Sequence, residues 1–410
     1  MKTHYKTLPF FLIISALIIS CSKNNDPVID EPTFYTLESD EYIGSMQPSI
    51  SKLIFTAMAQ QFDQAQGLAD EVITDASFYK ISYRTSFQGK PLLASGVVCM
   101  PDTPGSYPVI SFQNGTYVEH NKAPSVDTGS DLFKLLKSVS TMGFIVVIPD
   151  YPGFGESQEV LHPYLEVNNT VPSMIDMLKA TREFSKRAHI HADLNNDLYL
   201  MGYSQGGWST MQLQDSIEQA GLEDYTLKAS SCGAGPYDLN YTTSLILNQE
   251  AYPMPYFLAY LMHAYNVHEQ FPNELDEIFA DEYASKIPAL FDGVQSGEQI
   301  NAQLTTQIDD LLQADYILGY QDSVAYEPIR QAFSANSVTA WDIATPVHLY
   351  HGANDTFVPV EVSQKLKADF DALNISQQVQ LTILPDVNHK SAILPFGFAT
   401  LKWFLELKNN

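Results

Sequence analysis

The chain has 410 residues, of which 45% are hydrophobic and 12% aromatic, a composition typical of a globular protein rather than of a disordered or fibrous one. Its 22 basic and 48 acidic residues give a net charge of −26, which argues against nucleic-acid binding, because phosphate recognition depends on clustered Lys and Arg. The length allows one enlarged α/β domain with an insertion as readily as two domains.

The N-terminus has the pattern of a secretory signal. Lys2 and Lys6 precede an apolar run that is too short to cross a bilayer. The run ends in Ile-Ile-Ser followed by Cys21, which resembles the lipobox of a bacterial lipoprotein, where the signal is cut before the cysteine and lipid is attached to it. We therefore predict a signal peptide (1–20), a lipid on Cys21 and a polar tether (21–32). Such a protein is exported to the cell envelope, where the lipid is its only membrane anchor; the outer membrane is one location that fits. An ordinary cleaved signal peptide, without lipid, is the alternative.

The segment after the tether (33–77) is predicted to be a helical extension that packs against the edge of the core. Its apolar residues recur at i, i+3, i+4, i+7 and i+8, as expected for one face of a helix: Ile50, Leu53, Ile54, Ala57 and Met58. Two strand-like runs follow, joined by a Gln-Gly-Lys-Pro turn (88–91), and they predict a hairpin that opens a sheet.

Beyond this hairpin, strand-like runs alternate with helical patterns, which predicts a mainly parallel, doubly wound sheet with helices on both faces. The predicted strands are 109–112, 144–148, 198–201, 227–233, 347–350 and 379–384. Between 237 and 341 no strand-like run occurs, and apolar residues come at helical spacing instead. We therefore predict an α/β core (78–236 and 342–410) that is interrupted by a helical cap (237–341).

Two cysteines besides the predicted lipid-bearing one, Cys99 and Cys232, lie in strand-like apolar runs. Buried, unreactive thiols are the expected state, and a disulfide is the alternative in an exported protein.

A short polar cluster precedes the strand-like run 198–201. It contains His189, His191 and Asp193, but these residues lack the spacing of a metal site and are interpreted as a turn. No metal and no cofactor is predicted.

The stretch GYSQG (202–206) is the strongest chemical signal in the chain. A strand-like run precedes it and a helical pattern follows it, and in that setting G-x-S-x-G is typical of a nucleophile elbow. The turn lifts the central side chain off the sheet, and glycines flank it because a Cβ there would collide with neighbouring elements. Ser204 is the predicted nucleophile, and a glycine-rich turn with a solvent-facing serine is the alternative.

A serine hydroxyl needs a base within hydrogen-bonding reach and a third group that orients the base. Asp355 and His389 each follow one of the last two predicted strands. Because the carboxyl ends of parallel strands meet at one edge of a sheet, both residues are expected to converge on Ser204. The chain order Ser, Asp, His is that of the elbow enzymes. Asp386 is a second candidate for the acid.

With this order of strands, elbow and polar residues, the chain from 78 to 407 resembles an α/β-hydrolase, and its helical insertion stands where that family has a cap. The resemblance implies that Ser204 is the nucleophile, that His389 acts first as general base and then as general acid, and that Asp355 orients His389.

The resemblance also implies an oxyanion hole made by two backbone N–H groups. One would come from Gln205, which follows the nucleophile, and the other from Thr116, in a loop after an early strand. The family usually has a His-Gly pair in that loop, and here Asn114 and Gly115 take its place.

The elbow, the oxyanion loop and the aromatic-rich cap are most similar to those of secreted lipases and carboxylesterases. The resemblance implies hydrolysis of a small-molecule or lipid ester through an acyl-enzyme. Candidate pocket residues are Asn114, Tyr117, Tyr256 and Phe257.

Two alternatives stay open. A capped serine aminopeptidase uses the same fold and triad, and it would need acidic cap residues to hold the free amine of a substrate; Glu269, Glu274 and Glu277 are available. A non-catalytic surface-binding protein on the same scaffold is the other alternative. Protein partners are not predicted.

Overall fold

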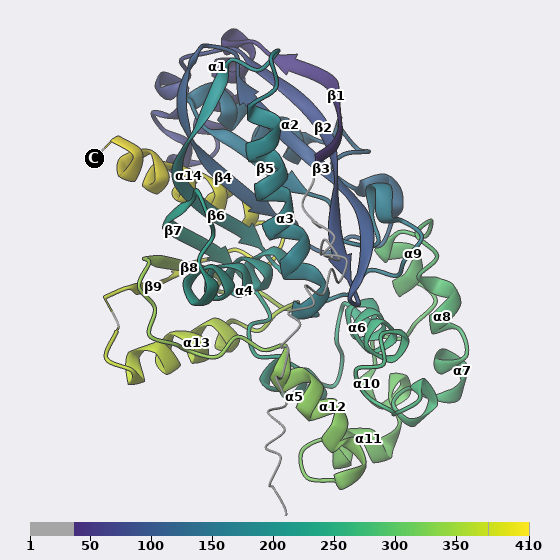
Figure 1. The fold of residues 1–410 in the computed structure, drawn as a ribbon. Coiled ribbons are helices and arrows are strands. Elements are labelled where there is room, and N and C mark those ends of the chain that lie inside the picture. Colours follow the sequence, from purple (N-terminus) through teal and green to yellow (C-terminus); the bar gives the residue numbers. More distant parts are fainter. Residues whose placement is uncertain (1–36, 376, 410) are drawn as a thin grey trace, which may run out of the picture. The chain divides into compact units, whose positions relative to one another are not determined.

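The computed structural model describes residues 37–375 and 377–409, so the predicted signal peptide, Cys21 and the tether lie outside the described residues. Within the described part, nine strands form one sheet in the order β1-β2-β3-β5-β4-β6-β7-β8-β9 (Figure 1). The strands are β1 (Leu37–Met46), β2 (Ala76–Phe87), β3 (Lys90–Pro101), β4 (Gly105–Gln113), β5 (Ile145–Pro149), β6 (Ala192–Tyr203), β7 (Thr226–Gly233), β8 (Val347–Gly352) and β9 (Val379–Leu384).

The sheet is antiparallel at one edge and parallel over the rest. β1, β2, β3 and β5 pair antiparallel in turn, whereas β5, β4, β6, β7, β8 and β9 pair parallel. From β4 the chain moves to β5 on one side and then returns to β6 on the other, which makes β4 and β6 a topological switch point. In open α/β sheets, ligands bind at the carboxyl ends of the strands at such a point.

Helices cover both faces of the sheet, as predicted. Side chains alternate between the faces along each strand: Val109 packs with α3 (Val167–Ser185) and α4 (Gln205–Ala220). Its neighbour Ile110 packs with the opposite layer, which consists of α1 (Pro48–Ala59), α2 (Asp131–Val139) and α14 (Ile393–Asn409). Helix α13 (Val360–Ala372) packs on β8 and β9.

The segment between β7 and β8 is helical, which confirms the predicted cap insertion. Figure 1 shows its helices as a green group beside the carboxyl ends of the strands. They are α5 (Leu239–Leu247), α6 (Pro255–Val267), α7 (Asp281–Ala284), α8 (Ile287–Leu290), α9 (Gly297–Asn301), α10 (Ile308–Leu311), α11 (Ala314–Gly319) and α12 (Glu327–Ala335).

The prediction of an all-helical segment before the hairpin was wrong at its start. Leu37–Met46 is a strand, β1, which pairs antiparallel with β2 and extends the sheet by one edge strand. Helix α1 follows, but it buries Ser51 and Phe55, whereas Ile50 and Leu53 are exposed. Pairing with β2 and contact with the core, neither of which is local in sequence, decide both features.

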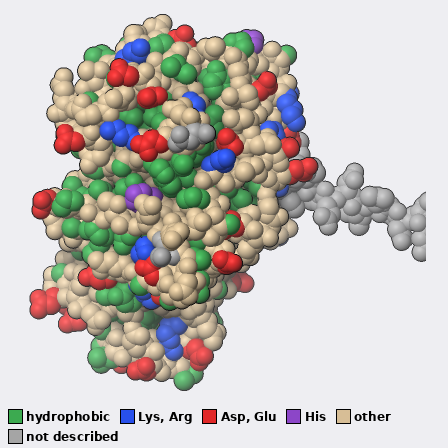
Figure 2. Space-filling view, turned by 90° about the vertical axis from the view of Figure 1, so that its left-hand side faces the viewer, with side chains coloured by type: hydrophobic (Ala, Val, Ile, Leu, Met, Phe, Trp, Pro, Cys, Tyr) green, Lys and Arg blue, Asp and Glu red, His purple; other side chains and the backbone are tan. Residues whose placement is uncertain are grey.

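The two cysteines of the core are buried free thiols, Cys99 on β3 and Cys232 on β7. On the face drawn in Figure 2, acidic and basic side chains are interspersed, and no continuous basic patch covers it. None of the described helices is long and apolar enough to cross a membrane.

Candidate active site

The turn between β6 and α4 has the geometry of a strained elbow. Ser204 adopts φ 60° and ψ −123°, a region that non-glycine residues rarely occupy. A Cβ on Gly202 would collide with the carbonyl oxygen of Gly206, and one on Gly206 would collide with that of Gln113 in β4. The two glycines therefore allow β6, the turn and α4 to approach closely enough to project the serine from the sheet edge.

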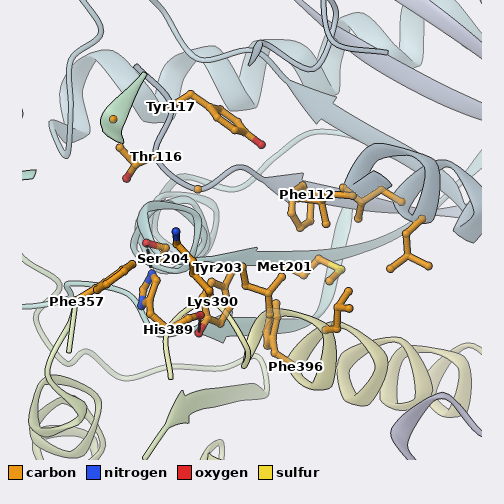
Figure 3. Close-up of a pocket in the computed structure, with 18 of the residues that line it drawn as sticks. Phe112, Thr116, Tyr117, Met201, Tyr203, Ser204, Phe357, His389, Lys390 and Phe396 are labelled. Atoms are coloured by element: carbon orange, nitrogen blue, oxygen red, sulfur yellow. Dashed lines mark hydrogen bonds between the residues drawn. The ribbon is translucent and has the colours of Figure 1, made fainter. Parts of the chain in front are cut away.

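The three residues expected to converge do so. The Ser204 hydroxyl lies 2.9 Å from Nε2 of His389, and Nδ1 of His389 lies 2.6 Å from Oδ2 of Asp355. Figure 3 shows Ser204 and His389 facing each other at the end of the cavity. Asp386, the other candidate for the acid, is exposed to solvent.

A second histidine, which the sequence analysis did not single out, contacts the same carboxylate. Nε2 of His351 lies 3.2 Å from Oδ2 of Asp355 and 2.9 Å from the carbonyl oxygen of Val358, and its Nδ1 lies 2.7 Å from the Ser363 hydroxyl. Because the carbonyl can only accept, Nε2 carries the proton and Nδ1 accepts from Ser363.

Asp355 is thereby held as a carboxylate. Its Oδ1 accepts hydrogen bonds from the backbone N–H groups of Phe357 and Val358, while Oδ2 faces both imidazoles. Burial alone would raise its pKa, but the hydrogen bonds from His351 and His389 outweigh burial and hold the pKa well below its usual range.

The loop that carries His389 is hydrogen-bonded to the elbow strand β6. The hydroxyl of Tyr203, the residue before Ser204, donates to the carbonyl oxygen of His389 at 2.8 Å. The ring of Phe357 packs 5.1 Å from the imidazole. These contacts tie the position of the imidazole to the strand that positions the serine.

The two N–H groups expected to form an oxyanion hole lie in the loops that border Ser204. The N–H group of Gln205 lies at the first residue of α4, and the N-terminus of a helix favours negative charge. A Cβ on Gly115 would lie only 3.9 Å from the Cβ of Ser204, so the loop carrying Thr116 runs against the elbow. Among the described residues, neither N–H has a hydrogen-bond acceptor.

Thr116 is supported by the cap. Its hydroxyl shares a hydrogen bond of 2.9 Å with the hydroxyl of Tyr164. The ring of Tyr164 stacks on Tyr260 of α6 at 4.8 Å, and Tyr260 stacks on Phe291 at 4.6 Å. A column of aromatic rings thus connects the oxyanion loop with the cap helices.

His162 is another residue that the sequence analysis missed, and it holds the side chain of Gln205. Its Nδ1 donates to the carbonyl of Pro152 at 2.8 Å, so its Nε2 accepts from the amide of Gln205 at 2.6 Å. Burial lowers the pKa of His162 to about 4, which keeps it neutral and able to accept. No local motif marks either His162 or His351, because each meets its partner only after the loops have folded.

The expectation that Asn114 lines the substrate pocket was wrong. Its side chain is buried, and the side-chain amide donates to the backbone carbonyl of Pro149 at 2.8 Å. The backbone carbonyl of Asn114 accepts from the hydroxyl of Tyr151 at 3.1 Å. The Asn-Gly-Thr loop begins inside the sheet edge, so its first side chain is hydrogen-bonded to the last residue of β5 and only later residues reach the cavity.

A cavity of about 670 Å³ lies against Ser204 and His389, a size typical of small-molecule sites. Tyr117, Tyr256 and Phe257, three of the candidate pocket residues, line it. Burial raises the pKa of Tyr117 to about 12, so its hydroxyl stays protonated. A much smaller space of about 40 Å³ touches Ser204 from the cap side.

The charged groups at the mouth of the cavity are not those considered for the aminopeptidase alternative. Glu119, Glu298 and Lys390 line it. The cap carboxylates considered for an amine site, Glu269, Glu274 and Glu277, are exposed elsewhere.

The interpretation of the polar cluster as a turn was wrong for Asp193, because this residue already lies in the elbow strand β6, and His191 and Asp193 are exposed. His189 lies 3.4 Å from Asp40 of β1. Among the described residues, no group of three or more His, Cys, Asp or Glu is placed to hold a metal ion.

No protein-family model matches the sequence, and no curated protein matches it. Solved structures do match. A Legionella pneumophila protein provisionally described as a hydrolase has a TM-score of 0.80 and 26% identity, over 91% of this chain and 98% of that one. The rice cell wall degrading esterase LipA from Xanthomonas oryzae has a TM-score of 0.78 and 23% identity, over 92% of this chain and 100% of that one. Candida antarctica lipase A in its closed state has a TM-score of 0.63 and 16% identity, over 91% of this chain and 81% of that one.

Proposed function

Since the chain has the α/β-hydrolase fold of these structures, we propose that it is a serine-dependent hydrolase of carboxylic esters that works through an acyl-enzyme on Ser204. The observation that carries the proposal is the unbroken hydrogen-bonded chain from Ser204 through His389 to Asp355, beside a largely apolar cavity. A structural serine at a turn would need neither the strained backbone nor the buried imidazole that accepts its proton.

In the acylation step, Nε2 of His389 takes the proton from the Ser204 hydroxyl while the serine oxygen attacks the ester carbonyl carbon. Asp355 stays ionised, keeps the imidazole in the Nδ1–H tautomer and stabilises the imidazolium that forms. The imidazolium then protonates the alcohol oxygen, the carbon–oxygen bond of the ester breaks, and the acyl group remains on Ser204.

The tetrahedral intermediate carries a negative charge on the former carbonyl oxygen. The N–H groups of Gln205 and Thr116 are the donors for this charge, and loss of one such donor typically lowers kcat by about 10²–10³. Water then attacks the acyl-enzyme, His389 again acts as base and acid, and the carboxylic acid is released.

The second candidate is a serine aminopeptidase. It is favoured by one observation, the position of Glu119 and Glu298 at the mouth, where two carboxylates can hold the free amine of a substrate. Lys390 at the same mouth opposes that role. The apolar walls and the esterase and lipase neighbours favour esters.

A direct test uses the form of the chain that begins after Cys21. Labelling with a fluorophosphonate should add one phosphonyl group to Ser204, detected by mass spectrometry of the peptide that contains it, and Ser204→Ala should remain unlabelled. kcat/KM for p-nitrophenyl esters should exceed that for aminoacyl p-nitroanilides. Anilides ahead of esters would establish the peptidase, and absence of labelling would favour a non-catalytic binding protein.

We also propose that the protein is exported and carries lipid on Cys21, because the sequence before this residue has the pattern of a lipoprotein signal. Labelled palmitate should enter the wild-type protein and not the Cys21→Ala variant. Equal labelling of both, or of neither, would remove the proposal without affecting the catalytic one.

A further inference from the structure

The cavity beside Ser204 has two parts with different walls. Its mouth is bordered by loop and cap residues, among them Glu119, Phe257 and Lys390. The other part, here called the core compartment, lies between the sheet and helices α1, α2 and α14. Its walls include the following apolar side chains: Ile110, Leu136, Val139, Val146, Met201 and Leu401.

The core compartment runs along the strands, away from their carboxyl ends. Figure 3 shows Met201, Phe112 and Phe396 on the opposite side of Tyr203 from Phe357. Ile110 is in register with Tyr199, four residues before Tyr203 on β6. At ~3.3 Å per strand residue, the compartment reaches about 13 Å below the level of Tyr203.

The chemistry of the walls changes with depth. Among the described residues, the charged side chains of the cavity belong to the loops and the cap at the mouth, including Glu119, Glu298 and Lys390. Below them the walls are aliphatic, aromatic and thioether groups. A ligand that extends from Ser204 into the core compartment therefore meets mainly apolar side chains, which favours an apolar group there.

Helix α2 shows that this space is unusual for a core. Leu132, Leu135, Leu136 and Val139 recur at i, i+3, i+4 and i+7, the spacing of a stripe that normally packs directly on a sheet. Here the stripe lines the compartment. Protein interiors are close-packed, and large apolar voids are costly to leave empty. An apolar chain is the occupant that fills such a space without leaving a polar group unpaired.

A glycine helps to keep the compartment open. Gly397 lies inside helix α14, where glycine is less favourable than alanine. It lines the cavity, and a Cβ added to it would have no atom within 4 Å. Larger side chains at this position would therefore occupy the compartment without first displacing a neighbour.

We infer that the core compartment binds the acyl chain of a long-chain aliphatic ester, with the scissile carbonyl at Ser204 and the alcohol directed to the mouth. This inference rests on the proposed ester hydrolysis and names its substrate class. The space on the cap side of Ser204, with walls that include Ile246, is about 40 Å³ and too small for such a chain.

The test compares kcat/KM for p-nitrophenyl acetate, butyrate, octanoate and palmitate in the wild type and three variants. The wild type should prefer octanoate or palmitate to butyrate. Gly397→Leu should lower the octanoate-to-butyrate ratio by about tenfold or more, since a methylene in an apolar pocket is worth about 10–200-fold in discrimination. Gly397→Ala should lower it much less. Ile246→Phe narrows the cap-side space, and if it, rather than Gly397→Leu, abolished the long-chain preference, the inference would be overturned.

The direction of the chain is tested with two isomeric esters. Ethyl octanoate carries the long chain on the acyl side, whereas octyl acetate carries it on the alcohol side. Gly397→Leu should reduce hydrolysis of ethyl octanoate selectively. A selective loss on octyl acetate would place the alcohol in the core compartment and overturn the assignment.

A binding measurement separates this inference from the proposed function. cis-Parinaric acid, a fluorescent long-chain fatty acid, should bind Ser204→Ala, and its Kd should rise about tenfold in the Ser204→Ala/Gly397→Leu double variant. If no ester were hydrolysed but this difference held, the proposed function would fail and the apolar-chain site would stand. If esters were hydrolysed but Gly397→Leu left the chain-length profile unchanged, this inference would be contradicted and the proposed function would stand. Thermal melting of each variant identifies any that does not fold.

Discussion

Nε2 of His351 lies 3.2 Å from Oδ2 of Asp355, the same oxygen that accepts a hydrogen bond from Nδ1 of His389 at 2.6 Å. The carboxylate is therefore held between two imidazoles. Only His389 reaches Ser204, so His351 acts through Asp355 as a positioning residue.

Replacing His351 by leucine should lower kcat by about 10–100-fold, because a hydrogen bond to a charged group contributes about 1.5–3 kcal/mol. KM should change by about twofold at most, since the imidazole touches no substrate. His351→Gln, whose Nε2 can reach a similar position, should restore part of kcat. Steady-state kinetics on one p-nitrophenyl ester measure all three proteins. A rise in KM at constant kcat would contradict the positioning role.

The contact between His162 and Gln205 should influence the oxyanion hole. His162→Phe preserves a ring next to Tyr151, on which the imidazole stacks at 5.4 Å, but it removes the acceptor for the Gln205 amide. We expect kcat to fall by about tenfold, as when a buried donor loses its partner. His162→Asn offers a carbonyl oxygen and should be less affected. Equal losses in both variants, accompanied by equal losses of melting temperature, would indicate a packing role only.

Replacing Gly206 of α4 and Gly397 of α14 by alanine should change the free energy of unfolding in opposite directions. In Gly206→Ala the new Cβ collides with the backbone of Gln113, so the free energy of unfolding should fall by more than about 2 kcal/mol. Gly397→Ala meets no atom, and the helix should gain up to about 1 kcal/mol. Urea unfolding measures both. Similar effects at the two positions would contradict the close approach of β4 and α4 at the elbow.

The strand, turn and helix of the elbow could be predicted because they occupy consecutive residues, with glycines where a Cβ cannot fit. Asp355 and His389 could be predicted because the carboxyl ends of parallel strands share one edge. Both inferences need only local sequence and one rule of sheet geometry.

Other parts of the site depend on contacts that no local pattern carries. His162 and Gln205 lie 43 residues apart and meet through a loop. Strand β1 depends on pairing with β2, and Asn114 turns inward because the end of β5 lies beside it. The core compartment was missed for the same reason, since the apolar stripe of α2 has the sequence pattern of ordinary packing.

Glu166 should make stability depend on pH. Burial raises the pKa of this carboxyl to about 7. The hydrogen bond from the Asn169 amide to Oε1, at 2.6 Å, opposes burial but does not outweigh it. The folded state therefore binds the proton more tightly than the unfolded state, whose pKa is ~4.3. The stabilisation of the folded state by this bound proton is complete below the unfolded pKa and is lost as pH rises through 7.

Glu166→Gln removes that loss, because the amide does not ionise. Relative to the wild type, the variant should gain up to about 3 kcal/mol of unfolding free energy at pH ~8.5 and almost nothing at pH ~4.5. Urea unfolding at the two pH values provides the comparison. An equal gain at both would show that the carboxyl does not titrate as proposed.

The central claim is that Ser204 is the nucleophile of an ester hydrolase. It is tested most directly by kcat/KM for p-nitrophenyl butyrate in the wild type and in Ser204→Ala, with folding of both checked by melting temperature. We predict a fall of about 10⁴-fold or more in the variant, since loss of a triad nucleophile removes covalent catalysis. Turnover by folded Ser204→Ala at the wild-type rate would contradict the account.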